Sequence, residues 1–261
     1  MREEKFGLRL KWLGCACFEM DFGGLTVVND PWITDNPATE LTWEAVERCD
    51  YITVTHAHYD HITDIPALVK KFDPRLMCGE NTALPLMRYA DMVPMRVLPM
   101  YPDQELDLEA VKVRALYGRH VIQPGTVSQR DEQWRTNPRT AADPLMQELG
   151  RWGDFEYRNY LYTLPAGIKV LLWGNTVDLP EQRAILRAVR PDIAIVQGTR
   201  KNIPADLARL CKCMGARVVI PHHLDFPRDN SAWWEELSAQ LRQQAPDIRC
   251  IRPTYGQWLE L

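Results

Sequence analysis

The sequence predicts a single α/β domain in which two β-sheets are covered by helices. Its 261 residues are 46% hydrophobic and 25% charged, which suits one globular domain with a large buried core. Strand patterns joined by turns fill the first third of the chain, and strand and helix patterns alternate from about residue 160 onward. No segment rich in Gly, Pro or charge divides the sequence, so we expect one domain over residues 1–261.

The first third is expected to form mainly strands. The expected elements are strands over 8–13, 17–22 and 25–28, a hairpin turn at Gly23-Gly24, a short helix over 43–49 and a strand over 51–55. The last strand runs directly into the segment HAHYDH, residues 56–61. A dense cluster of polar side chains therefore follows the carboxyl end of a strand, where α/β folds place their chemistry.

The rest of the chain alternates between helix and strand patterns, apart from one irregular stretch. Helices are expected over 65–72, 82–90, 180–189, 204–214 and 232–243, and strands over 111–117, 160–164, 169–173, 193–197, 217–220 and 248–251. Residues from about 121 to 158 contain three prolines and lack a clear period. We interpret them as an insertion or lid with one short helix.

Composition excludes several classes of function. The formal net charge is −4 and Lys and Arg form no long run, which disfavours nucleic acid as a partner. The acidic N-terminus does not resemble a signal peptide, and no apolar stretch is long enough for a bilayer. The seven cysteines form no CxxC pair, and we expect a reducing cytoplasm, with Cys15 and Cys17 as candidate core residues. A small-molecule substrate is the expected partner, and the oligomeric state stays open.

The histidines indicate a metal site. All six lie in three places, each directly after an expected strand: His56, His58 and His61; His120; and His222 and His223. Imidazole and carboxylate ligands suit zinc, manganese or iron, and no Cys lies within these clusters. Histidines also occur in ordinary loops, but three of them with Asp60 in six residues favour a site for one or two divalent ions.

The motif Thr55-His56-Ala57-His58-Tyr59-Asp60-His61 resembles the signature of the metallo-β-lactamase superfamily. Further segments resemble the subgroup that includes L-ascorbate-6-phosphate lactonase: Trp12-Leu13-Gly14, Val28-Asn29-Asp30-Pro31, Pro191-Asp192-Ile193-Ala194 and Ile220-Pro221-His222-His223. The resemblance covers nearly the whole chain. It implies a four-layer αββα sandwich with the site at the open edge of the two sheets.

The resemblance also implies roles for individual residues. His56, His58 and His120 would bind one ion, and Asp60, His61 and His223 would bind the other. Asp30 would lie beneath the metal-binding loop and hydrogen-bond its backbone, unless it is a plain turn residue before Pro31. His222 is expected to pack or hydrogen-bond beside the site. The implied ions are zinc or manganese, with iron as an alternative.

Two positions depart from the family pattern. Cys15 stands where the family usually has His, and Asn175 replaces the Asp that bridges both ions in a Gly-Asp-Thr motif. An Asn oxygen is neutral, so Asn175 would be a weak bridge. Asp178 is the alternative ligand, although Asp178-Leu179-Pro180-Glu181 also reads as a helix capping box.

The implied activity is hydrolysis of a lactone, ester or phosphodiester by water activated at the metal, with Asp60 also orienting the nucleophile. Arg200 and Lys201 are candidate contacts for an anionic substrate or members of a solvated loop. The insertion carries five arginines but also many acids, which favours a solvated lid. Two other classes of protein remain as alternatives. One is a non-catalytic metal-binding or regulatory module, which Asn175 in place of the bridging Asp would suit, and the other is a di-iron redox protein.

Overall fold

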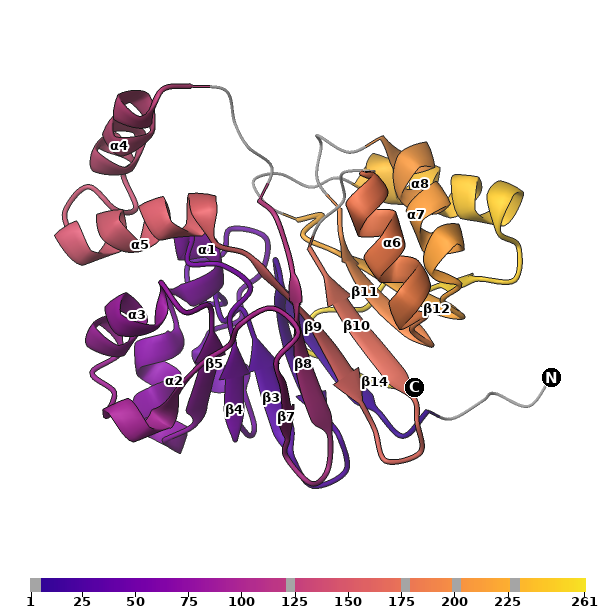
Figure 1. Ribbon diagram of the computed structural model, residues 1–261, viewed down its shortest axis with the longest axis horizontal. Coiled ribbons are helices and arrows are strands. Elements are labelled where there is room, and N and C mark those ends of the chain that lie inside the picture. Colours follow the sequence, from indigo (N-terminus) through magenta and orange to yellow (C-terminus); the bar gives the residue numbers. More distant parts are fainter. Residues whose placement is uncertain (1–5, 121–124, 175–178, 199–202, 226–230) are drawn as a thin grey trace.

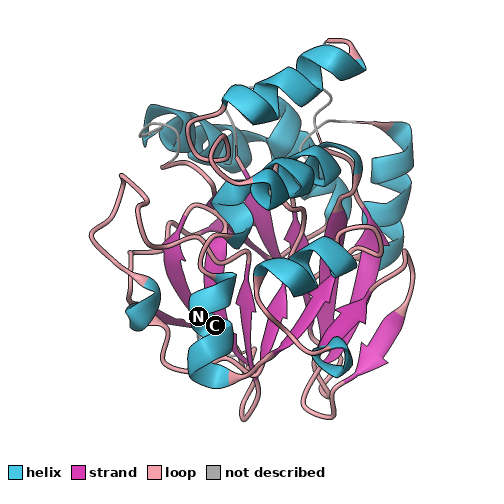
Figure 2. Cartoon of the chain, turned by 90° about the vertical axis from the view of Figure 1, so that its left-hand side faces the viewer, coloured by secondary structure: helices cyan, strands magenta, loops and turns pink. Residues whose placement is uncertain are grey.

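Two β-sheets lie face to face between two layers of helices. The computed structural model describes residues 6–120, 125–174, 179–198, 203–225 and 231–261. Figures 1 and 2 show the strands of both sheets running through the middle of the molecule with helices on the outside. The expected αββα sandwich is therefore confirmed.

The first sheet has seven strands in the order β14-β1-β2-β3-β4-β5-β6. Their bounds are β1 Arg9–Gly14, β2 Cys17–Asp21, β3 Thr26–Asn29, β4 Tyr51–Thr53, β5 Arg75–Cys78, β6 Val97–Pro99 and β14 Trp258–Glu260. β1 to β3 form an antiparallel meander, whereas β3 to β6 run parallel. The carboxyl ends of the parallel strands thus meet at one edge.

The second sheet has the order β13-β12-β11-β10-β9-β8-β7. Its strands are β7 Glu105–Asp107, β8 Lys112–Tyr117, β9 Arg158–Thr163, β10 Lys169–Trp173, β11 Ile193–Gln197, β12 Val218–His222 and β13 Arg249–Cys250. β10 to β13 are parallel, and β7 to β10 are antiparallel.

The helices cover the outer faces of the sheets. They are α1 Tyr59–Ile62, α2 Ile65–Phe72, α3 Ala83–Tyr89, α4 Val127–Thr136, α5 Pro144–Phe155, α6 Pro180–Val189, α7 Pro204–Met214 and α8 Ser231–Gln244, with 3-10 turns η1 Trp43–Ala45 and η2 Pro94–Arg96. Leu68 of α2 and Leu86 of α3 pack against the first sheet, and Leu186 and Leu207 of α6 and α7 pack against the second. None of the described helices is both long and apolar enough to cross a membrane.

The main core lies between the sheets, and polar ties cross it near one edge. Its buried side chains include Phe18, Met20 and Ile195. The Tyr160 hydroxyl on β9 donates to the Val54 carbonyl at 2.9 Å, and the Arg158 backbone N–H donates to the Thr55 carbonyl at 2.8 Å. These bonds fix the second sheet to the chain just before the His56 loop.

The expected helix over 43–49 is wrong, because only the 3-10 turn η1 forms there. The buried Glu19 carboxylate accepts the backbone N–H groups of Glu47 and Arg48, and the Lys11 ammonium donates to the Ala45 carbonyl. Tertiary hydrogen bonds therefore replace the intrahelical bonds that the pattern suggested. The insertion differs from the expectation as well, since it contains two helices, α4 and α5, instead of one.

Candidate metal centre

The histidine-bearing segments meet at the edge where the parallel strands end. His56 and His58 follow β4, His58 caps the short helix α1, and α1 itself carries Asp60 and His61. His120 follows β8 and His223 follows β12, both from the second sheet. The edge therefore collects side chains from both halves of the sandwich.

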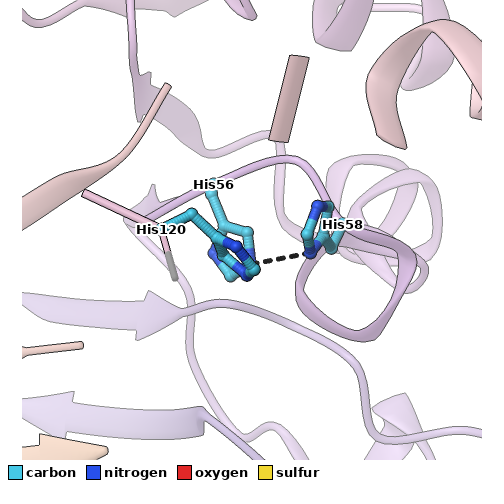
Figure 3. A group of neighbouring side chains, drawn as sticks. All are labelled: His56, His58 and His120. Atoms are coloured by element: carbon cyan, nitrogen blue, oxygen red, sulfur yellow. Dashed lines mark hydrogen bonds between the residues drawn. The ribbon is translucent and has the colours of Figure 1, made fainter. Parts of the chain in front are cut away.

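His56, His58 and His120 form the first group of donors. One ring nitrogen from each lies within 4.8 Å of the others, and Figure 3 shows the three rings turned toward one another. The His56 Nε2 and His58 Nδ1 atoms are 3.1 Å apart. Nitrogens bound at 2.0–2.1 Å to one tetrahedral ion lie about 3.3–3.4 Å apart, so this spacing fits a shared zinc-like ion.

A hydrogen-bond chain from Asp30 fixes the tautomer of His56. The Thr55 hydroxyl donates to Asp30 Oδ2 at 2.7 Å, and the Thr55 N–H donates to Asp30 Oδ1 at 2.7 Å. Because the hydroxyl proton goes to Asp30, the Thr55 oxygen accepts from His56 Nδ1, 3.0 Å away. The proton of neutral His56 therefore lies on Nδ1, and Nε2 presents a lone pair. Burial and the neighbouring imidazoles hold the pKa of His56 well below its usual value.

Asp154 of the inserted helix α5 fixes His58 in the same way. The His58 Nε2–H group donates to Asp154 Oδ1 at 3.2 Å, so a neutral His58 presents its Nδ1 lone pair on the side of His56. Trp134 of α4 donates its Nε1–H to Asp154 Oδ2 at 2.9 Å. Burial would raise the pKa of Asp154, but these hydrogen bonds hold it below its usual value, so the group is a carboxylate.

In the structure His56 Nε2 and His58 Nδ1 lie at hydrogen-bond distance, the dashed line in Figure 3. A cation bound there would take the place of the proton between them, and a ring nitrogen of His120 lies within 4.8 Å of one from each of the other two rings. The donor set is imidazole alone, which suits zinc or iron better than manganese. The described residues therefore fit a divalent ion at this position.

A second group lies beside the first. One donor atom each from Cys15, Asp60 and His223 lies within 4.8 Å of the other two. Asp60 Oδ2 is 3.5 Å from His223 Nε2 and 3.9 Å from His61 Nε2. Burial would raise the pKa of Asp60, yet His61 and His223 lower it well below its usual range. The rings of His56 and His61 are 4.0 Å apart, so the two groups adjoin.

The structure also places the other residues predicted for the site. These are the predicted ligands His61 and His223 and the predicted supporting residues Asp30 and His222. His61 Nδ1 lies 2.9 Å from Asp30 Oδ2, and its Nε2 lies 3.9 Å from Asp60 Oδ2. Burial lowers the pKa of His223, but Asp60 outweighs this effect and raises it. His222 is buried on β12 and packs edge-on against Phe18 with ring centroids 5.5 Å apart. Asn175, Asp178, Arg200 and Lys201 lie outside the described residues.

Three buried residues near the site were missed by the sequence analysis. Asp154 supports His58, and Asp225 accepts the Cys15 N–H at 2.8 Å. Tyr157 stacks on His56 with ring centroids 4.8 Å apart, and its hydroxyl donates to Gln197. A Cβ on Gly174 would lie 1.5 Å from the Tyr157 hydroxyl, so Tyr157 requires glycine there. The position of Asp225, two residues after His223, is a local signal that could have suggested it.

A cavity of about 300 Å³ opens beside His120. Arg119, Arg130 and Asp154 contribute its charged lining, and the exposed side chains of Val127 and Phe155 contribute apolar surface. Arg130 is nearly buried and lies 3.3 Å from Asp154. The cavity thus combines guanidinium groups, an apolar rim and one of the candidate ligands.

The two-sheet sandwich with histidines at its open edge defines a protein of the metallo-β-lactamase fold class. Comparison with known proteins supports this assignment independently. A family model described as "Beta-lactamase superfamily domain" matches residues 9–223. The solved structure of Igni18, a metallo hydrolase from the archaeon Ignicoccus hospitalis, has a TM-score of 0.70 at 15% identity, covering 97% of this chain and 98% of that one.

Curated relatives narrow the assignment. A "UPF0173 metal-dependent hydrolase" from Solibacter usitatus is 38% identical over 250 residues, covering 94% of this chain and 97% of the relative. Another from Nitratidesulfovibrio vulgaris is 27% identical over 258 residues, covering 97% and 95%. The chain belongs to the beta-lactamase superfamily and, within it, to the UPF0173 metal-dependent hydrolase family.

Proposed function

We propose that this chain hydrolyses an ester, lactone or phosphodiester bond in an anionic small molecule, with one or two divalent ions at the edge of the sandwich. The observation that carries the proposal is the convergence of ring nitrogens from His56, His58 and His120, with His56 Nε2 and His58 Nδ1 only 3.1 Å apart. Bound there, a divalent ion would lower the pKa of a water molecule and polarise the bond to be cleaved.

The residues around the donors would hold this centre rigid during turnover. Thr55 and Asp30 fix His56, and Asp154 fixes His58, so neither ring needs to reorganise when substrate binds. Asp60 is ionised and faces both His61 and His223. In the proposed reaction Asp60 contributes a ligand and also accepts a hydrogen bond from the attacking water, which orients it.

The side chains that line the cavity beside His120 suit an anionic substrate. The guanidinium groups of Arg119 and Arg130 can donate paired hydrogen bonds to a carboxylate or phosphate, and Val127 and Phe155 can contact an apolar portion. Arg119 directly precedes the candidate ligand His120 in the chain and lines the same cavity. We therefore choose Arg119 to test direct contact with the substrate anion.

Matched pairs of substrates test the proposal. The metal-loaded chain is assayed with an aryl acetate, an aryl hemisuccinate that adds a carboxylate, a γ-lactone and bis(p-nitrophenyl) phosphate. We expect turnover to be lost when metal is removed and higher kcat/KM for the anionic member of the ester pair. Arg119→Gln should raise KM for the anionic ester by about tenfold or more and leave the neutral ester unchanged, because one charged hydrogen bond contributes about 1.5–3 kcal/mol.

Arg151→Gln is the matched control, because Arg151 lies on α5 but pairs with Asp131, 3.3 Å away, and does not line the cavity. Tight metal binding without hydrolysis of any of these substrates would instead support the non-catalytic module. If the Arg119→Gln variant prefers the anionic ester as strongly as the wild type does, the proposal that the substrate is anionic is overturned.

A further inference from the structure

We propose that the Cys15 thiolate is a ligand of the second ion, beside Asp60 and His223, and makes that position select zinc over manganese. The inference rests on the metal centre of the proposed function, but on neither its substrate nor its turnover. Cys15 was expected from the sequence to be a core residue at a position where the family usually has His. Its Sγ instead lies within 4.8 Å of donor atoms of both Asp60 and His223.

The spacing is compatible with coordination of one ion. A sulfur at about 2.3 Å and a nitrogen at about 2.0 Å from one tetrahedral ion lie about 3.5 Å apart, and the donor atoms here lie within 4.8 Å of one another. Cys15 is fully buried, and it forms a small apolar cluster with Ala16 and Trp32. The sulfur is therefore shielded from bulk solvent, and it lies close to two candidate ligands.

The backbone of Cys15 is held in place from both sides. Cys15 lies in the two-residue connection between β1 and β2 with φ at 45°, the left-handed region that non-glycine residues rarely occupy. Its carbonyl accepts the His223 backbone N–H at 3.0 Å and the Trp12 Nε1–H at 3.1 Å. One hydrogen bond thus joins two of the proposed ligands directly, and His223 is itself left-handed, with φ at 60°. Strained residues that the surroundings hold so firmly are concentrated at functional sites.

Asp225 completes this support. Its Oδ2 accepts the Cys15 N–H at 2.8 Å and the Tyr255 hydroxyl at 3.0 Å, and the carboxylate is buried. Asp225 is therefore a positioning residue, which orients the turn that presents the sulfur.

The charges of the two groups differ. The first group offers three imidazoles, whereas the second has Asp60 as the only carboxylate among its described close donors. Ion binding would displace the thiol proton to solvent, and thiolate and carboxylate together would then balance the two charges of the ion. Thiolate is a soft ligand that favours zinc, while manganese prefers oxygen ligands. The second position should therefore bind zinc much more tightly than manganese.

Cobalt(II) is a direct probe of the sulfur. The full-length chain is stripped of metal and titrated with cobalt(II), because a cobalt–thiolate bond gives a near-ultraviolet charge-transfer band that imidazole and carboxylate do not. We expect the wild type to develop this band as its second equivalent binds. Cys15→Ser should lose the band, and its affinity for zinc at one of the two positions should fall about tenfold or more, with little change for manganese.

Cys17→Ser is the matched control. Cys17 begins β2 two residues further on, is equally buried and belongs to the apolar cluster beneath α2 and α3. This variant should keep the cobalt band. A band that survives in Cys15→Ser, or a wild type that binds two cobalt ions without it, would overturn the proposal.

X-ray absorption at the zinc edge keeps the proposal testable if Cys15→Ser fails to fold. In the wild type with two zinc ions, we expect a sulfur neighbour at about 2.3 Å. Because only one of the two ions would bind sulfur, the average over both ions would be half a sulfur per zinc atom. Only nitrogen and oxygen neighbours would refute the assignment. Neither experiment uses turnover, so a sulfur ligand in a chain that hydrolyses none of the test substrates would uphold this inference while the proposed function failed.

Discussion

His58 and Asp154 are 96 residues apart in the sequence, yet their side chains are joined by a hydrogen bond of 3.2 Å between Nε2 and Oδ1. This contact ties the inserted helices to the histidine loop. The insertion is therefore more than a cover over the site, because one of its carboxylates determines which nitrogen of His58 is available for metal.

Replacing Asp154 with Ala should weaken the first metal position. Without the carboxylate, His58 can place its proton on Nδ1 and turn its lone pair away from His56. Loss of such a supporting carboxylate typically lowers metal affinity by about 10–100-fold. Competition with a chromogenic chelator would measure the effect, with Asp131→Ala as control, since Asp131 lies in the same insertion but pairs with Arg151. Equal affinities for the two variants would show that Asp154 does not orient His58.

Gly153→Ala should disturb the same contact through steric overlap. An added Cβ would lie 2.4 Å from His58 Cδ2 and 2.8 Å from the His58 backbone nitrogen, so α5 must move away. Ala is favoured over Gly inside a helix by about 1 kcal/mol, which opposes the damage. We expect a net destabilisation of about 1–2 kcal/mol and weaker metal binding, measured by chemical denaturation and chelator competition. Glu148→Ala, at an exposed position of α5, should change neither. A fully stable Gly153→Ala variant with normal affinity would contradict the close packing.

Removing metal should lower stability, and the stabilisation by metal should grow with the logarithm of the free metal concentration above Kd. Because the donors converge only in the folded chain, free zinc at 100 times its Kd should add about 2.7 kcal/mol to the free energy of unfolding for each site. The measurement is thermal denaturation with EDTA and at stepped zinc concentrations, with His120→Ala expected to show a smaller increase. A midpoint that does not depend on zinc would mean that no ion binds the folded state preferentially.

The sequence predicted those parts of the fold and site that local patterns determine. β10, α6, β11 and α7 have the predicted bounds, because each is an uninterrupted apolar period between turn residues. The histidine groups were recognised because each follows a strand, and parallel strands bring their carboxyl ends to one edge.

What the sequence could not reveal depends on distant contacts. Asp225 is 210 residues from Cys15 and Asp154 is 96 from His58, so no local pattern marks either pairing. The prediction of a helix over 43–49 was wrong for the same reason, because the Glu19 carboxylate of β2 accepts hydrogen bonds from backbone N–H groups of this segment. Short strands such as β6 and β7 have three residues each, too few to establish a period.

Asp60→Ala should abolish hydrolysis while the fold is retained. Asp60 lies in the first turn of α1, and its Oδ2 faces His223 Nε2 at 3.5 Å and His61 Nε2 at 3.9 Å. Its removal deprives the second position of its carboxylate and deprives the proposed attacking water of its acceptor. Loss of a single group that stabilises the transition state commonly costs about 100–1000-fold in kcat, and we expect at least that.

Steady-state kinetics of Asp60→Ala and Asp60→Asn, each with measured zinc content, separates the two roles of this side chain. Asp60→Asn keeps the shape and loses the charge, so it should retain the fold and the first ion and should still lose zinc at the second position. If excess zinc restores occupancy in Asp60→Asn but kcat stays low, the carboxylate acts on the water as well as on the ion. Normal kcat in metal-loaded Asp60→Ala would show that Asp60 serves neither purpose, and Cys15 and His223 would then have to hold the second ion without it.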